Sequence, residues 1–200
     1  MKMSGKEKPG RQRNRASATA GEGRASPLDW AQAVHGVLQR SGVRIVAYVP
    51  DAGHKRLIEL CEADRSMRTV VLTTEEEGVG VAAGAWLGGE KSVLLMQSSG
   101  VGNIVNSLGM IRECRFPLLM LVTMRGEFGE FNPWQVPMGR ATAGVLKAMG
   151  AVVDRIETAD QATAVVDAAA RLAANSYAAV AVLISQRMIG IKSFQEQVDR

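Results

Sequence analysis

Six short runs of apolar residues alternate along the chain with stretches in which apolar positions recur at helical spacing. The apolar runs predict buried strands at residues 44–49, 68–72, 92–96, 116–122, 151–153 and 178–184. Strands that are apolar throughout are typical of a parallel sheet covered by helices on both faces. The alternation therefore predicts a single three-layer α/β/α domain with a six-stranded, mainly parallel sheet.

The boundaries of this domain follow from composition. Residues 27–186 contain all the periodic segments, including a helix over about 138–149 and another over 158–176 that Thr158 and Gln161 should cap. Residues 1–26 are basic and almost free of large apolar side chains, so we expect a disordered tail. Residues 187–200 are polar and are expected to form a loose C-terminal extension.

The net charge of +4 is concentrated at one end of the chain. Seven basic and two acidic residues in the tail contribute +5, which leaves −1 for the rest. A near-neutral domain argues against a nucleic-acid-binding face. No apolar run reaches the ~18 residues that cross a bilayer, and no secretory signal is visible. Two distant cysteines and two unpaired histidines indicate a cytoplasmic protein with no metal site.

Three successive carboxylates follow the strand at 68–72 and precede a helix of very small residues. Glycine in a helix interior costs roughly 1 kcal/mol against alanine, so the glycines of this helix indicate close approach by a ligand or another helix. The carboxylates, Glu75–Glu77, have two readings that remain open at this point. They form a capping box with Thr73 or Thr74 at the helix N-terminus, or one of them lies in a subunit interface and binds a cofactor.

Other polar residues also follow the predicted strands. The carboxyl ends of parallel strands form the ligand-binding edge of such a sheet, and this edge should carry Asp51, Glu75–Glu77, 97–103 and 125–135. The turn at 98–103 follows a strand and opens a helix, so it is either an anion-binding turn or a plain tight turn. No complete P-loop, dinucleotide fingerprint or nucleophile elbow is present in the sequence.

The ordered set of these segments resembles a known family. Val49-Pro50-Asp51, a glutamate before a Gly/Ala helix, Met96–Asn103 with Asn106-Ser107-Leu108, and Met124–Glu127 occur in the order found in the pyrimidine-binding domain of thiamine-diphosphate decarboxylases. Within that family the chain is most similar to sulfopyruvate decarboxylases, and phosphonopyruvate decarboxylases come next. The resemblance covers about residues 27–186 and implies the same three-layer fold.

The resemblance implies a role for one of the three acids. In this family a glutamate hydrogen-bonds N1′ of the cofactor's aminopyrimidine and thereby promotes deprotonation of the thiazolium ring, which then acts as the electron sink for decarboxylation. The matching position is Glu76, and it is the predicted catalytic residue. The same resemblance places Gln97, Ser98, Gly100 and Asn103 beside the cofactor.

The resemblance also implies a partner and a substrate class. The sequence lacks the Gly-Asp-Gly motif and the following asparagine that hold the diphosphate and Mg²⁺ in these enzymes. We therefore expect those groups on a β subunit, in a hetero-oligomer, with a homodimer as the alternative for the isolated chain. The expected substrate is a small anionic 2-oxo acid, with sulfopyruvate preferred to phosphonopyruvate, and Asp51, His54 and Arg125 are the predicted substrate-binding residues. A non-catalytic assembly or regulatory module is the rival from another class.

Overall fold

Six parallel strands form the sheet of this protein, for which a computed structural model describes residues 29–190. The strands are β1 (Val43–Tyr48), β2 (Arg68–Val71), β3 (Lys91–Gln97), β4 (Leu118–Thr123), β5 (Val152–Ile156) and β6 (Ala179–Ile184). They lie in the order β2-β1-β3-β4-β6-β5, and every neighbouring pair is parallel. The predicted fold class is therefore confirmed. The predicted tail and residues 191–200 lie outside the described residues.

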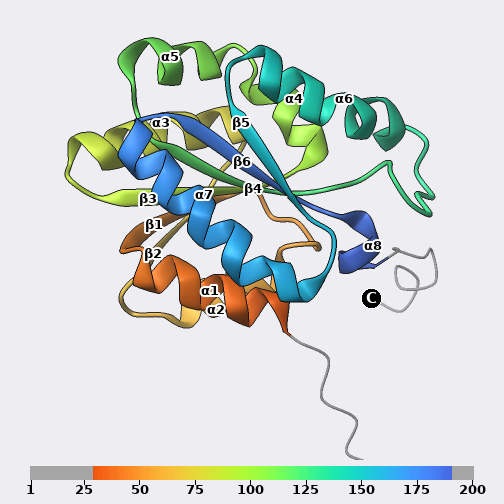
Figure 1. Cartoon of the computed structure of the whole chain (residues 1–200), viewed down its shortest axis with the longest axis horizontal. Helices are drawn as coiled ribbons and strands as arrows, with labels where there is room; N and C mark the ends of the chain where they lie inside the picture. The colour runs from red at the N-terminus through yellow and green to blue at the C-terminus, as the bar shows by residue number, and fades with distance from the viewer. Residues whose placement is uncertain (1–28, 191–200) are drawn as a thin grey trace, which may run out of the picture.

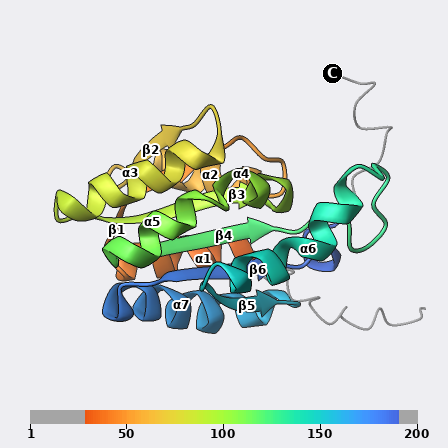
Figure 2. The same ribbon diagram turned by 90° about the horizontal axis from the view of Figure 1, so that it is seen from above.

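Helices cover both faces of the sheet. They are α1 (Trp30–Arg40), α2 (Lys55–Ala63), α3 (Glu75–Leu87), α4 (Val101–Ile104), α5 (Ser107–Cys114), α6 (Gln135–Ala148), α7 (Ala162–Ser176) and α8 (Gln186–Ile189), with 3₁₀ turns η1 (Ser98–Gly100) and η2 (Ala159–Gln161). Figure 1 shows α4, α5 and α6 above the sheet and α1 and α2 below it, and Figure 2 shows the layers from above. No helix in residues 29–190 combines the length and apolar character needed to cross a membrane.

The sheet divides the buried side chains into two clusters. One cluster joins α1, α2 and α7 to residues such as Val46, Leu95 and Val182. The other joins α3, α4, α5 and α6 to residues such as Leu94 and Met120. Successive residues of a strand point to opposite faces, so a strand that is apolar throughout serves both clusters. This burial fixes the register of the central strands, and hence the position of their carboxyl ends.

The strands β1, β2, β3, β4 and β6 differ from the predicted bounds by one or two residues at an end, and three elements differ more. Helix α6 begins three residues before the predicted position, because Pro137 lies in the first turn, where no backbone donor is needed. Strand β5 continues to Ile156, because an edge strand paired only with β6 can turn polar side chains outward. Residues 186–189 form α8 where a loose segment was expected, and Ser185 caps this helix by accepting a hydrogen bond from the Arg187 amide. The predicted cap of Thr158 and Gln161 is confirmed.

The packing of α6 gives a stability prediction. A Cβ on Gly139 would lie 2.0 Å from the backbone oxygen of Arg125, whereas a Cβ on Gly144 of the same helix would meet nothing within 4 Å. Because backbone cannot move aside as a side chain can, Gly139→Ala should lower the free energy of unfolding by about 1–3 kcal/mol. Gly144→Ala should raise it by about 0.5–1 kcal/mol through helix propensity. Urea unfolding of both variants measures the difference, and equal effects would contradict the close approach.

Candidate active site

The polar residues singled out in the sequence gather at the carboxyl edge of the sheet. From β1 the chain passes to β2 on one side of the sheet, and it then returns to β3 on the other side of β1. The boundary between β1 and β3 is therefore a topological switch point, which is where open parallel sheets bind ligands. Asp51 follows β1. Gln97 is the last residue of β3, and the η1 turn follows it. Two neighbouring strands therefore place polar groups at the same edge of the sheet, as the sequence predicts.

The Asp51 carboxylate joins the ends of three adjacent strands. Its Oδ1 accepts a hydrogen bond from Gln97 Nε2 at 2.9 Å, and its Oδ2 accepts one from Thr123 Oγ1 at 2.5 Å. Gln97 Oε1 in turn accepts from Ser99 Oγ at 3.0 Å. The side chain of Asp51 is only 5% exposed. Thr123 is the one residue of the junction that the sequence analysis did not single out, although it is the only polar residue of β4.

His54 lies behind this junction. Its Nδ1 is 3.7 Å from Asp51 Oδ2, and its side chain is fully buried. Burial lowers the pKa of His54 to about 4, although the Asp51 charge opposes the shift. Neither ring nitrogen has a hydrogen-bond partner within residues 29–190. In this conformation His54 supports Asp51 from inside the protein, and its predicted contact with substrate stays a prediction.

The three carboxylates at the start of α3 point in three directions. Glu75 is buried and accepts a hydrogen bond from Asn103 Nδ2 at 2.7 Å. Glu77 reaches back past the N-cap residue Thr74 and accepts from the Thr73 amide at 2.8 Å, and Thr74 makes no side-chain cap, so the capping box itself does not form. Glu76 is exposed and makes no hydrogen bond or ion pair within the described part of the chain. Structural roles thus account for two of the acids and leave the predicted catalytic carboxylate open to solution.

A small glycine in η1 allows Glu75 to sit where it does. A Cβ on Gly100 would lie 2.2 Å from Glu75 Oε1 and 2.6 Å from its Cγ. Together with the bond from Asn103, this contact fixes the first turn of α3 against η1 and α4. Gly100 and Asn103 were predicted beside the cofactor, and in this structure both contact the neighbour of Glu76.

Helix α3 carries glycines on its exposed face, where no neighbouring atom of the described residues requires a small residue. Gly78 packs on the sheet, where an added Cβ would lie 2.4 Å from Leu94 Cδ1. Gly80 and Gly84 are exposed, and an added Cβ would meet nothing within 4 Å of either residue. These two glycines follow Glu76 at intervals of four residues, so they share its side of the helix. The surface beside Glu76 is therefore open backbone.

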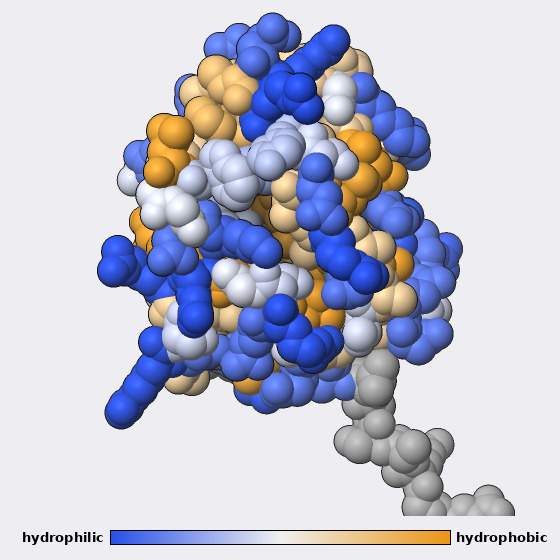
Figure 3. All heavy atoms as spheres, turned by 60° about the vertical axis from the view of Figure 1, so that its left-hand side comes forward, coloured by the Kyte–Doolittle hydropathy of each residue, from blue (hydrophilic) through white to orange (hydrophobic). Residues whose placement is uncertain are grey.

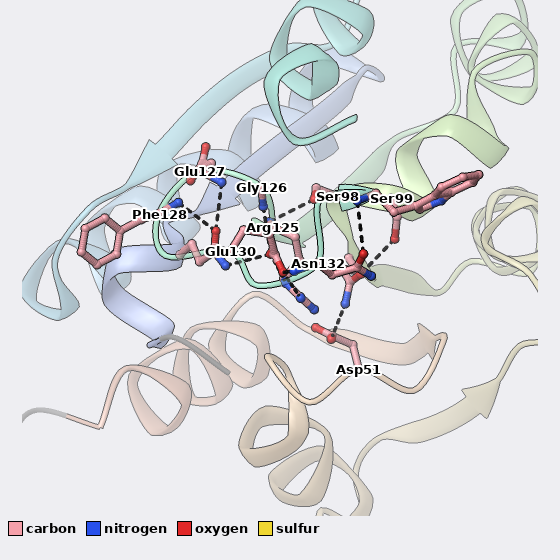
Figure 4. Close-up of polar contacts among 12 residues, drawn as sticks. Asp51, Ser98, Ser99, Arg125, Gly126, Glu127, Phe128, Glu130 and Asn132 are labelled. Atoms are coloured by element: carbon pink, nitrogen blue, oxygen red, sulfur yellow. Dashed lines mark hydrogen bonds and ion pairs between the residues drawn. The ribbon is translucent and has the colours of Figure 1, made fainter. Parts of the chain in front are cut away.

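Arg125, predicted to bind substrate, is engaged within its own loop. Its guanidinium forms a bidentate pair with Glu130, at 2.7 Å from Nε to Oε2 and 2.5 Å from Nη2 to Oε1 (Figure 4). Both side chains are less than 10% exposed. This pairing, with amide donors from Gly126 and Asn132, lowers the pKa of Glu130 to about 2. Arg125 would have to leave Glu130 before it could bind an anionic substrate.

The loop that carries Arg125 is held by the C-terminal part of the structure. Gln186 at the start of α8 accepts hydrogen bonds from the amides of Glu127 and Phe128 and donates one to Glu130. The Arg187 guanidinium lies 3.9 Å from the centre of the Phe128 ring. The sequence analysis missed Gln186 and Glu130. Their signal was weak, because each lies among other polar residues in a segment without periodicity.

Ser98 completes the connection between the loop and η1. It is fully buried, and its Oγ accepts a hydrogen bond from the Arg125 amide at 3.0 Å. Hydrogen bonds therefore join Asp51 to Gln97 and Ser98 to the Arg125 backbone, and the two pairs are linked because Gln97 and Ser98 are consecutive residues. Glu76 lies apart from this network on the exposed turn of α3. Among residues 29–190 no group of three or more His, Cys, Asp or Glu side chains is placed to hold a metal ion.

Comparison with known proteins identifies the class to which this arrangement belongs. Residues 28–128 match the family model described as thiamine pyrophosphate enzyme, N-terminal TPP binding domain. The chain therefore belongs to this family, and the predicted resemblance and its cofactor, thiamine diphosphate, are confirmed. The free Glu76 carboxylate beside an open backbone face fits an aminopyrimidine, which needs an acidic partner at a ring nitrogen and close approach to its flat surface.

Several individual proteins of known name are similar in sequence to this chain. The chain is 35% identical over 158 residues to sulfopyruvate decarboxylase subunit alpha of Methanococcus maripaludis, covering 78% of this chain and 95% of that protein. It is 40% identical to the subunit of that name in Methanothermobacter thermautotrophicus, covering 60% of this chain and 73% of the relative. A phosphonopyruvate decarboxylase of Streptomyces viridochromogenes is 39% identical over 52% of this chain, which corresponds to 27% of that relative.

A solved structure supports the fold. A 2-oxoglutarate:ferredoxin oxidoreductase from Magnetococcus marinus matches with a TM-score of 0.67, over 80% of this chain and 29% of that one. Its sequence identity is 18%, so this similarity shows a common fold only.

The buried histidine gives a prediction for pH dependence. The folded-state pKa of His54 is about 4, below the ~6.5 of an unfolded histidine, so the unfolded chain binds the additional proton between these values. The free energy of unfolding should therefore fall by up to about 3 kcal/mol as the pH drops from about 6.5 to about 4. Urea unfolding across this range should show the loss in the wild type and not in His54→Leu. The control His35→Gln should retain it, and a pH-independent wild type would contradict the assignment.

Proposed function

We propose that this chain is the pyrimidine-binding α subunit of a two-chain, thiamine-diphosphate-dependent decarboxylase that converts 3-sulfopyruvate to sulfoacetaldehyde and CO₂. The observation that carries the proposal is the difference in surroundings among the three glutamates at the start of α3. Glu75 and Glu77 have partners within the chain, whereas Glu76 is exposed beside the open face of Gly80 and Gly84. A carboxylate meant for a cofactor at a subunit interface should be left open in this way.

The cofactor and the protein would divide the chemistry between them. When bound, thiamine diphosphate supplies an electron sink for the loss of CO₂ from a 2-oxo acid. Glu76 would bind the ring nitrogen of the aminopyrimidine and hold its proton. Gln97 and Ser98 would shape the edge against which the pyrimidine lies. The groups that hold the diphosphate and Mg²⁺ are assigned to the partner chain.

The Asp51 junction would serve the substrate. Two hydrogen bonds from neighbouring strands fix its carboxylate, so its orientation needs no adjustment when a substrate arrives. His54 would keep the region behind this carboxylate free of water. Arg125 would meet the sulfonate only after exchanging the Glu130 carboxylate for it, which makes the loop at 125–130 the part of the site that must rearrange.

A separate β subunit is supported by the lengths of the relatives. This chain covers 95% of a relative named as subunit alpha. It covers only 29% of a Methanosarcina acetivorans relative named sulfopyruvate decarboxylase without a subunit label. The remaining part of such a longer protein corresponds to what the partner would provide. The open face of α3 is the surface on which we place that contact.

The role of Glu76 can be tested by substitution. In the complex with the chain that carries the diphosphate-binding domain, Glu76→Gln should lower turnover by about 100-fold or more, because the amide cannot hold the proton. Size-exclusion chromatography should show an intact complex. The matched control Glu77→Gln keeps an oxygen that can accept from the Thr73 amide, so turnover should persist. Undiminished turnover in Glu76→Gln, with an inactive Glu75→Gln, would move the role to Glu75.

The substrate is tested by a direct comparison. The wild-type complex should release CO₂ from 3-sulfopyruvate with a kcat/KM at least about tenfold above that for phosphonopyruvate. Activity on phosphonopyruvate alone would show that the proposed substrate is wrong, while the proposed reaction, decarboxylation of a 2-oxo acid, would stand. An intact complex without turnover on any 2-oxo acid would instead support the non-catalytic assembly module.

A further inference from the structure

A cavity lies at the end of the sheet opposite the candidate active site. Its volume is about 260 Å³, and it opens between the C-terminal ends of α1, α3 and α7 and the beginnings of β3 and β4. Figure 3 shows this side of the molecule, which is hollowed near its middle, with hydrophobic residues inside a hydrophilic surround. Asp51, Gln97 and Glu76 do not line it, so the cavity is separate from the site described above.

The apolar part of the cavity lining includes three alanines of α7, and Ser41, Ser92 and Asn175 add neutral polar groups to the lining. Ala170, Ala173 and Ala174 leave space where longer side chains would fill it, and the buried Val43 and Leu119 form the floor. The indole of Trp86 forms a wall. It is held edge-to-face by Tyr177, with 5.6 Å between ring centroids and an interplanar angle of 69°. The cavity thus has a rigid aromatic side and a floor that suits a flat apolar group.

The rim of the cavity carries an excess of positive charge. Three basic side chains and two acidic ones line it, namely Arg40, Lys91, Arg171, Glu90 and Asp167. Arg171 is paired with Asp167 at 2.5 Å. Lys91 Nζ donates to the Ser41 carbonyl at 3.0 Å and so offsets the partial negative charge at the C-terminus of α1. The Arg40 guanidinium forms no ion pair with any residue from 29 to 190. Once Arg171 and Asp167 have paired, Arg40 and Lys91 exceed Glu90 by one positive charge, so the rim favours a ligand with a single negative charge.

We propose that this cavity binds a small molecule with a flat apolar body and one anionic group. The apolar body lies on the alanine face of α7 beside Trp86, and the anion lies at the rim, where Arg40 meets it. The site is independent of the decarboxylation proposed above, so its test uses binding to the full-length chain and needs no activity.

The test uses 3-phenylpropanoate as the probe, because it has an aromatic ring and one carboxylate but is not a 2-oxo acid. The chain contains three tryptophans, so its ¹H–¹⁵N spectrum should contain three indole signals, which single Trp→Phe variants assign. Titration should shift the Trp86 signal to saturation with a Kd at or below about 1 mM. The signals of Trp30 and Trp134 should stay in place. No saturable shift of Trp86, or equal shifts of all three signals, would overturn the proposal.

Three variants and a neutral probe separate the contribution of cavity shape from that of charge. Ala174→Leu should fill the cavity and raise the Kd at least about tenfold, whereas Ala168→Leu on the exposed side of α7 should leave it unchanged. Arg40→Gln cannot disturb the core, because Arg40 is exposed, and it should also weaken binding. 3-Phenylpropanamide should bind at least about tenfold more weakly than the acid. Equal affinity of acid and amide, or wild-type affinity in Ala174→Leu, would overturn the assigned chemistry.

Discussion

The hydrogen bonds that Asp51 accepts from Gln97 and Thr123 determine the shape of the candidate active site. They link the carboxyl ends of β1, β3 and β4, which only the burial of apolar side chains on both faces brings into register. A carboxylate with 5% side-chain exposure is costly to bury unless such donors are present. The junction therefore depends on the packing of the sheet, and the orientation of Gln97 and of η1 depends on the junction.

The pattern of apolar residues was sufficient to predict the fold. Each strand contains an apolar run, so strand number, parallel direction and the ligand-binding edge followed from the sequence. The predicted element boundaries were wrong where a strand is buried on one side only or where a helix is very short. The outer part of β5 is polar because it borders solvent, and α8 is one turn long, too short to produce a periodic signal.

The candidate site was predicted less completely, because hydrogen-bond partners distant in sequence leave no local pattern. Asp51 and Gln97 were predicted as separate residues, but their contact spans 46 positions and involves Thr123 through a further strand. Arg125 was recognised as a cation, yet its partner Glu130 and their shared neighbour Gln186 became visible only in the structure. The resemblance singled out Glu76 among the three acids of α3, but the different surroundings of the three side chains became visible only in the structure.

The open face of α3 also affects how the isolated chain moves. Glycines give this helix a weak intrinsic preference for its own conformation, and at Gly80 and Gly84 no side chain shields the backbone hydrogen bonds from water. Local opening is easiest where such shielding is absent, so amide hydrogen exchange in the isolated chain should be faster on this side of α3 than in the central strands. A second chain docked there would dehydrate and stiffen the helix. The Glu76 carboxylate would then become rigid only when the second chain binds, and the unassembled subunit would stay inactive.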